Sequence, residues 1–173
     1  MGPSLSFHIG ERVVYPNHGV GTVENISTRT FGSRIERFYL LRLATNNLTV
    51  MVPFSHVTDV GLRKVTRTSE IQRVLDFLAS GRCTRCSDWK NRFRDNSDKM
   101  RNGELIDIAD VLKGLIEQQL SKPLSFREKK MLDRARHMLT TEVSSSRGVG
   151  IETATEILRK ALGRAELGWP EPL

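Results

Sequence analysis

The spacing of the apolar residues changes near residue 65, and this change divides the chain into two regions that fold differently. Residues 7–62 hold short runs of branched and aromatic residues separated by turn-forming residues. From Ser69 onward, apolar residues recur three and four positions apart, as in Ile71, Val74, Leu75 and Leu78. Short runs between turns favour strands and the second pattern favours helices. We therefore predict an α+β fold, with a small antiparallel β-barrel followed by a helical bundle.

The first region has the turns expected of antiparallel strand pairs. Strands are predicted over Arg12–Tyr15, Val20–Ser27, Arg37–Ala44 and Leu48–Val52. The cluster 16–19 joins the first pair, and residues 45–47 join the second, where asparagine tolerates a positive φ. Gly19-Val-Gly21 belongs to the first hairpin and not to a dinucleotide site, because no third glycine and no helix follow it. Pro53 ends the ladder because it has no N–H to donate.

The second region reads as a series of amphipathic helices. We predict helices around residues 71–78, over 105–120 and over 154–162. A further helix is predicted to begin at Trp89, with Ser87 or Asp88 as its cap. Another is predicted to follow the capping box at Ser125–Glu128. The predicted domains are accordingly 1–64 for the β-barrel and 65–166 for the helical domain. Residues 167–173 are expected to form a loose tail.

Positive charge is concentrated in one part of the chain. The net charge is +7, and residues 63–101 contain eleven Lys and Arg against five Asp and Glu. The flanking regions are nearly neutral. A basic region of this kind indicates a polyanionic partner such as nucleic acid, although many charge runs are only solvated faces.

The stretch Asp88–Arg94 is the candidate contact with that partner. On a helix, Trp89, Arg92 and Phe93 would share one side, while Lys90 and Arg94 would share another. Trp89 could be a core residue of the bundle, since tryptophan is highly buried on average. It could instead wedge into a DNA minor groove while Lys90, Arg92 and Arg94 meet phosphates. Phe93 is expected in the core.

Catalytic and metal chemistry lack the residues they require. Cys83 and Cys86 form one C-x-x-C without a second ligand pair, so we expect two ordinary reduced thiols and neither a metal site nor a cofactor. Asp107 and Asp110 are three residues apart, which predicts a solvated helix face for both. No nucleophile, base and orienting group can be assembled, so we do not expect an enzyme. No apolar run is long enough for a membrane span, and we expect a cytoplasmic protein without a signal peptide.

Several segments in register resemble one known family. They are Val13-Val-Tyr-Pro-Asn-His-Gly19, Leu48-Thr-Val-Met-Val-Pro53, Val60-Gly-Leu-Arg63, Trp89-Lys-Asn-Arg-Phe-Arg94 and Pro123-Leu-Ser-Phe-Arg-Glu-Lys-Lys-Met-Leu-Asp133. This order, from about Phe7 to Leu162, resembles the CarD/CdnL family of bacterial transcription regulators, in its short CdnL form without a basic tail.

The resemblance implies a Tudor-like, SH3-like barrel that docks on the RNA polymerase β subunit, and a helical domain at promoter DNA. It implies stabilisation of the open promoter complex formed with the housekeeping sigma factor. Trp89 matches the family's minor-groove tryptophan, and Arg94 falls where the family has a basic DNA contact. Arg29 matches a basic residue of the polymerase-binding surface. Met51 stands where many members have a polymerase-contacting arginine.

Two other functions remain open at this point, and we expect a monomer in each case. The chain could be an architectural DNA-binding protein that acts without polymerase. It could also be an adapter that binds polymerase and a second protein, in which case the basic residues 90, 92 and 94 would be dispensable.

Overall fold

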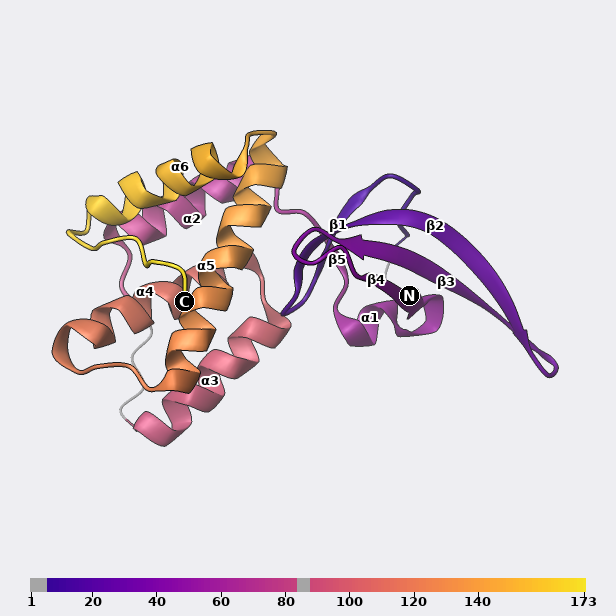
Figure 1. The fold of residues 1–173 in the computed structure, drawn as a ribbon, viewed down its shortest axis with the longest axis horizontal. Helices are drawn as coiled ribbons and strands as arrows, with labels where there is room; N and C mark the ends of the chain where they lie inside the picture. Colours follow the sequence, from indigo (N-terminus) through magenta and orange to yellow (C-terminus); the bar gives the residue numbers. More distant parts are fainter. Residues whose placement is uncertain (1–5, 84–87) are drawn as a thin grey trace. The chain divides into compact units, whose positions relative to one another are not determined.

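The chain forms two compact units, Met1–Val65 and Thr66–Leu173. The structure, a computed structural model, describes residues 6–83 and 88–173 (Figure 1). The first unit is built on a β-sheet and the second is helical. The predicted α+β class, with β structure before the helices, is therefore confirmed.

The β unit is a five-stranded antiparallel sheet in the order β4-β3-β2-β1-β5. Its strands are β1 (Arg12–Tyr15), β2 (Gly19–Phe31), β3 (Arg34–Leu43), β4 (Thr49–Pro53) and β5 (Arg63–Lys64). The turn before β4 contains Asn47 with a φ of +56°, the conformation expected of an asparagine there. Between β4 and β5 the chain forms a 3-10 helix, η1 (Phe54–His56), and a short helix, α1 (Val57–Val60), which the sequence pattern did not predict.

Strands β2 and β3 are longer than the sequence predicted. The expected strands ended at Ser27 and began at Arg37, whereas β2 and β3 stay paired up to Phe31 and Arg34. Residues 28–37 are mostly exposed and show no regular alternation of apolar residues. The two-residue turn Gly32-Ser33 joins the strands, with Gly32 at a φ of +61°. The rings of Phe31 and Phe38 meet across the two strands with centroids 6.2 Å apart. The strand pattern of the sequence did not identify this turn.

Alternation along the strands places one set of side chains inside the β unit. Val13, Val23, Tyr39, Leu41 and Val52 are at most 2% exposed and form the core with Phe7, Val57 and Leu62. The Tyr39 hydroxyl accepts a hydrogen bond from the Phe7 backbone N–H at 3.1 Å, and its ring stacks on Phe54 with centroids 4.2 Å apart. The buried hydroxyl thus has a partner, as the interior of a protein requires.

The described part of the second unit contains five helices. They are α2 (Thr68–Ser80), α3 (Trp89–Asn102), α4 (Leu105–Ser121), α5 (Phe126–Arg147) and α6 (Ile151–Gly163). The capping box predicted before α5 is present: Ser125 Oγ accepts from the Glu128 N–H at 3.3 Å, and Glu128 Oε2 accepts from the Ser125 N–H at 3.0 Å. Gly148 ends α5 with a φ of +65°, a conformation that glycine adopts without steric cost.

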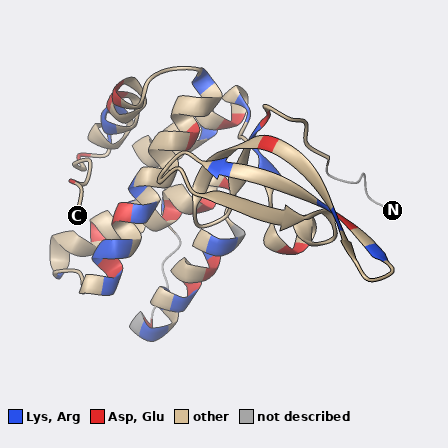
Figure 2. Cartoon of the chain, turned by 45° about the vertical axis from the view of Figure 1, so that its right-hand side comes forward, with Lys and Arg blue, Asp and Glu red and all other residues tan. Residues whose placement is uncertain are grey.

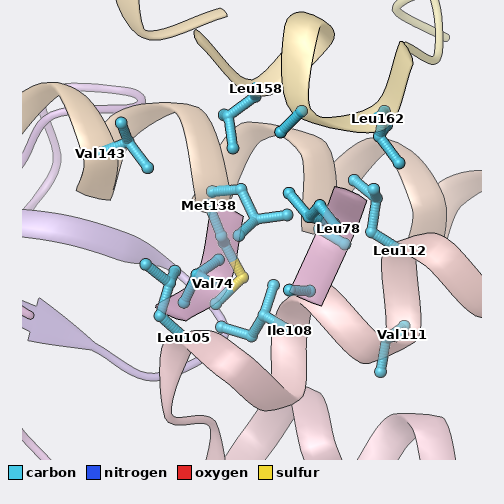
Figure 3. Packing of buried hydrophobic residues seen from close by; sticks show 14 of the residues in the cluster. Val74, Leu78, Leu105, Ile108, Val111, Leu112, Met138, Val143, Leu158 and Leu162 are labelled. Atoms are coloured by element: carbon cyan, nitrogen blue, oxygen red, sulfur yellow. The ribbon is translucent and has the colours of Figure 1, made fainter. Parts of the chain in front are cut away.

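All five helices contribute to one apolar core. Figure 3 shows side chains from α2, α4, α5 and α6 converging, among them Leu78, Ile108, Met138 and Leu158. Most of the predicted apolar face of α4 is buried here, but Leu120 is 77% exposed because it lies at the end of the helix. Asp110 was expected on a solvated face, yet its side chain is only 12% exposed.

The C-terminal residues, expected to be loose, make contacts within the helical unit. Leu167 and Trp169 are half-buried against the apolar core. The Leu173 N–H donates to Asp133 Oδ1 at 3.2 Å. Among the described residues, no helix is long and apolar enough to cross a membrane.

Candidate nucleic-acid interface

Helix α3 carries the tryptophan and the basic residues predicted to contact DNA. It starts directly after Asp88, whose Oδ1 accepts a hydrogen bond from the Lys90 N–H at 3.1 Å. The Asp88 carboxylate also accepts from Asn91 Nδ2 at 3.3 Å. Asp88 therefore acts as the predicted N-cap, which fixes the point at which the helix begins.

Trp89 is the first residue of α3. Its side chain lies outside the described part of the structure, so its predicted contact stays a prediction. Trp89 therefore lies in the first turn of α3. In the first turn of a helix, backbone N–H groups lack intrahelical partners and the helix dipole gives a partial positive charge, and both features favour a nearby anion.

The three predicted phosphate contacts lie within the first two turns of α3. Lys90 and Arg94 are exposed, and Arg92 is partly exposed. Arg94 Nη2 donates to Asn91 Oδ1 at 3.2 Å, which holds the guanidinium near the start of the helix. Figure 2 shows basic residues at several places along the helices, with acidic residues among them. Helix α3 has five basic and two acidic residues, so its balance is positive.

Phe93 connects α3 to the start of α5. It is half-buried, and the Arg127 guanidinium carbon lies 4.2 Å from the centre of its ring. This is a cation–π contact, which at a partly exposed site contributes roughly 0.5–1 kcal/mol. The expected core role of Phe93 is thus only partly met. Sequence reasoning missed Arg127, because the capping box places it in the first turn of α5 without indicating which helix it faces.

The other end of α3 is fixed to α4. Met100 is 3% exposed within the helical core, and the Lys99 ammonium forms an ion pair with the Asp110 carboxylate. Gly103 then allows the close approach of the two helices: a Cβ there would lie 2.8 Å from the Lys99 carbonyl oxygen and 3.1 Å from the Ile108 side chain. Helix α3 is therefore held at its C-terminal half, while its N-terminal half carries the exposed cations.

Cys83 is half-buried near α4, and Cys86 lies outside the described residues. Burial, and to a lesser extent the nearby carboxylates of Glu117 and Asp110, raise the pKa of the Cys83 thiol to about 12. Such a thiol is protonated at neutral pH and is a poor nucleophile. Among the described residues, no group of three or more His, Cys, Asp or Glu is placed to hold a metal ion.

The β unit brings Arg29 and Met51 to one face of its sheet. Arg29 pairs with Glu36 and Met51 pairs with Leu40, and both partners are on β3 four residues apart. Side chains at even separation along a strand share a face. This face, which we call the outer face, also carries Phe38 and Arg42 and lies opposite the buried Tyr39 and Leu41.

Comparison with known proteins identifies both units. Residues 7–66 match the family model described as the CarD-like/TRCF RID domain, and residues 73–159 match the model described as the CarD C-terminal domain. The chain is also similar to the Bacillus subtilis (strain 168) protein named "Putative transcription factor YdeB". The two are 34% identical over 143 residues, which cover 83% of this chain and 94% of that protein.

Proposed function

The chain belongs to the CarD family of transcription factors, and from this we propose that its β unit binds the RNA polymerase β subunit while its helical unit contacts promoter DNA and stabilises the open complex. The polymerase part of the proposal draws on the matched RID domain and on Arg29 and Met51, which share the outer face of the sheet. The complex would be that of the housekeeping sigma holoenzyme.

The observation that carries the DNA part is the N-terminal half of α3. A capped helix begins at Trp89, and Lys90, Arg92 and Arg94 follow within two turns. The rest of the helix is fixed to α4. The cations would neutralise phosphates on either side of a groove. The indole of Trp89 would wedge between base pairs at the upstream edge of the melted region, where the cost of unstacking has already been met.

Weak contacts of this kind are sufficient if they favour one state. A ligand shifts an equilibrium only by the difference in its affinity for the two states. Because polymerase binding through the β unit would keep the helical unit near the promoter, its effective concentration is high and its own affinity for duplex DNA can be low. The protein would then prolong the open complex without tight DNA binding of its own.

The test is the lifetime of open complexes on a ribosomal RNA promoter, measured with the wild-type chain and with Trp89→Ala. We expect the wild type to prolong the lifetime and the variant to lose most of the effect while its affinity for polymerase is unchanged. Lys160→Ala removes an exposed cation from α6 and serves as the control that should behave as wild type. An unchanged lifetime with a folded Trp89→Ala would contradict the wedge.

Two further measurements separate this function from its alternatives. Tight binding to duplex DNA without polymerase, at physiological salt, would favour an architectural protein. Full activity after combined neutralisation of Lys90, Arg92 and Arg94 would favour an adapter that binds polymerase and a second protein.

A further inference from the structure

The N-terminal half of α3 has little apolar packing of its own. Residues 90–99 contain a single apolar side chain, Phe93, and none of these residues is buried. Among the described side chains of α3, the first buried one is Met100, in the half that the Lys99–Asp110 ion pair fixes to α4. Helices in proteins are held in place mainly by the packing of an apolar face. The half that carries the predicted DNA contacts therefore depends mainly on the contacts of Phe93.

Phe93 meets a cation from another helix. The Arg127 guanidinium carbon lies 4.2 Å from the centre of the Phe93 ring. Phe93 belongs to the second turn of α3, and Arg127 belongs to the first turn of α5. A guanidinium group is planar and stacks on aromatic faces, which an ammonium group cannot do in the same way. This contact joins the N-terminal half of α3 to the start of α5.

The start of α5 is firmly held in the helical unit. Its capping box fixes the point at which the helix begins, and the Glu128 carboxylate also accepts hydrogen bonds from Gln118 Nε2 of α4, at 3.3 and 3.4 Å. Leu124, shortly before α5, is 5% exposed within the apolar core. The backbone that carries Arg127 is therefore fixed to α4 and to the core. Separation of Phe93 from Arg127 would require α3 to move.

The stability of α5 alone does not account for an arginine at position 127. The first turn of a helix carries a partial positive charge, so a cation there is unfavourable. Arg127 is exposed, and among the described residues no carboxylate forms an ion pair with it. The partner of its charge in the described structure is the Phe93 ring. The contact with α3 accounts for a cation at this position.

Position 89 lies one turn before Phe93 on the same side of α3. A tilt of the first two turns of α3 would therefore move both residues. From this juxtaposition we propose that Arg127 is a positioning residue: by holding the Phe93 ring, it fixes the direction in which α3 presents Trp89 to DNA. This rests on the proposed function. It adds a residue of α5 that contributes to the open complex through Trp89, and not through a phosphate contact of its own.

The first test measures amide hydrogen exchange of the full chain without DNA. Arg127→Met keeps a long unbranched side chain and high helix propensity but removes the charge. We expect exchange at residues 92–96 to rise roughly two- to fivefold, the scale of one exposed cation–π contact. Lys130→Met is the matched control, because Lys130 Nζ lies 4.6 Å from the centre of the Phe126 ring and both residues are on α5. Unchanged exchange in Arg127→Met, or an equal rise in Lys130→Met, would overturn the proposal.

A double-mutant cycle tests whether the two side chains act as a pair. Phe93→Leu removes the ring and keeps an apolar side chain, so it should raise exchange in α3 by a factor similar to that of Arg127→Met. The double variant should then exchange no faster than either single variant, because both changes remove the same contact. Additive effects would mean that the residues act separately, and they would overturn the proposal.

Two measurements with DNA separate positioning from direct contact, and this inference from the proposed function. The slope of log affinity against log salt for duplex DNA should be the same in Arg127→Met and wild type; a slope lower by about 0.9 would mean that Arg127 itself neutralises a phosphate, which overturns the positioning role. The open-complex lifetime should fall roughly two- to fivefold in Arg127→Met, in line with the loosening of α3. If Trp89→Ala shortens the lifetime and Arg127→Met does not, only this inference fails; if neither does, the proposed function fails as well.

Discussion

Glu142 holds Thr66 by two hydrogen bonds: Glu142 Oε1 accepts from the Thr66 backbone N–H at 3.0 Å and from Thr66 Oγ1 at 2.6 Å. Thr66 is the first residue of the helical unit, and Glu142 is only 2% exposed within α5. Ser146, one turn further along α5, donates its hydroxyl to the Thr66 carbonyl oxygen at 2.5 Å. The start of the helical unit is therefore fixed to α5 by side-chain contacts across 76 and 80 residues of sequence.

Replacing Glu142 by alanine should destabilise the helical unit by about 2–3 kcal/mol, because the Thr66 donors lose a charged acceptor. Urea unfolding followed by tryptophan fluorescence measures this directly, since both tryptophans, Trp89 and Trp169, belong to the helical unit. Glu171→Ala removes an exposed carboxylate from the tail and should leave the midpoint unchanged. An equal midpoint for Glu142→Ala and wild type would contradict the role of this contact.

Lys113 should prove necessary for stability although it carries a buried charge. It is 3% exposed, and its Nζ donates to the carbonyl oxygens of Phe77 at 3.0 Å and Gly81 at 2.7 Å, at the end of α2. Lys113→Met fills the same space but leaves these carbonyls without that donor, so we expect a loss of about 1–3 kcal/mol in thermal or urea unfolding. A more stable variant would mean that the cost of burying the ammonium exceeds the value of its bonds.

Each of Lys90, Arg92 and Arg94 should contribute to the salt dependence of DNA binding. Neutralising one of them removes one phosphate contact, which lowers the slope of log affinity against log salt by about 0.9 and weakens all sequences alike. Fluorescence anisotropy with duplexes of different sequence over a salt series measures both effects. Lys160→Ala is again the control. A sequence-dependent loss would instead indicate base recognition.

The Cys83 thiol should react slowly in the folded protein. With its pKa raised to about 12, almost no thiolate exists at pH 8, so alkylation of a Cys86→Ser variant should be slow until urea unfolds it. The folded state also holds the thiol proton more tightly than the unfolded chain does. This favours the folded state when the pH is below the ordinary pKa of a thiol, and the stabilisation is lost as the pH rises toward 12. Stability should therefore fall more steeply above about pH 9 in Cys86→Ser than in the double variant Cys83→Ser/Cys86→Ser. Parallel curves would contradict this.

Acid should weaken the helical unit through His137. Burial lowers the pKa of His137, and the neighbouring Arg136 lowers it further while Asp133 opposes the shift. The unfolded chain therefore binds a proton more readily, so the stabilisation is complete above about pH 6.5, the ordinary histidine value, and is lost as the pH falls through the folded-state pKa. His137→Gln should flatten this slope in unfolding curves from pH 7 to 5, whereas His8→Gln, at an exposed histidine, should not.

Elements with their own local signals could be predicted from the sequence. The Asp88 cap, the capping box at Ser125 and the apolar faces of α2 and α4 depend on residues within one or two turns of each other, and all are present. The extension of β2 to Phe31 was not predicted, because residues 28–37 lack the apolar alternation of a half-buried strand and only the turn Gly32-Ser33 indicates a hairpin there. The prediction that Asp110 lies on a solvated face was wrong. Asp110 forms an ion pair with Lys99, which lies on a different helix and could not be located from the sequence.

The sequence by itself determined the two-part architecture, the family and the concentration of positive charge around α3, because periodicity, caps and charge are properties of neighbouring residues. Only the tertiary structure decided that Arg29 and Met51 share one face, that Arg127 covers Phe93, and that Glu142 holds Thr66. Those relationships join residues from different elements, and their partners are chosen by strand register and helix packing.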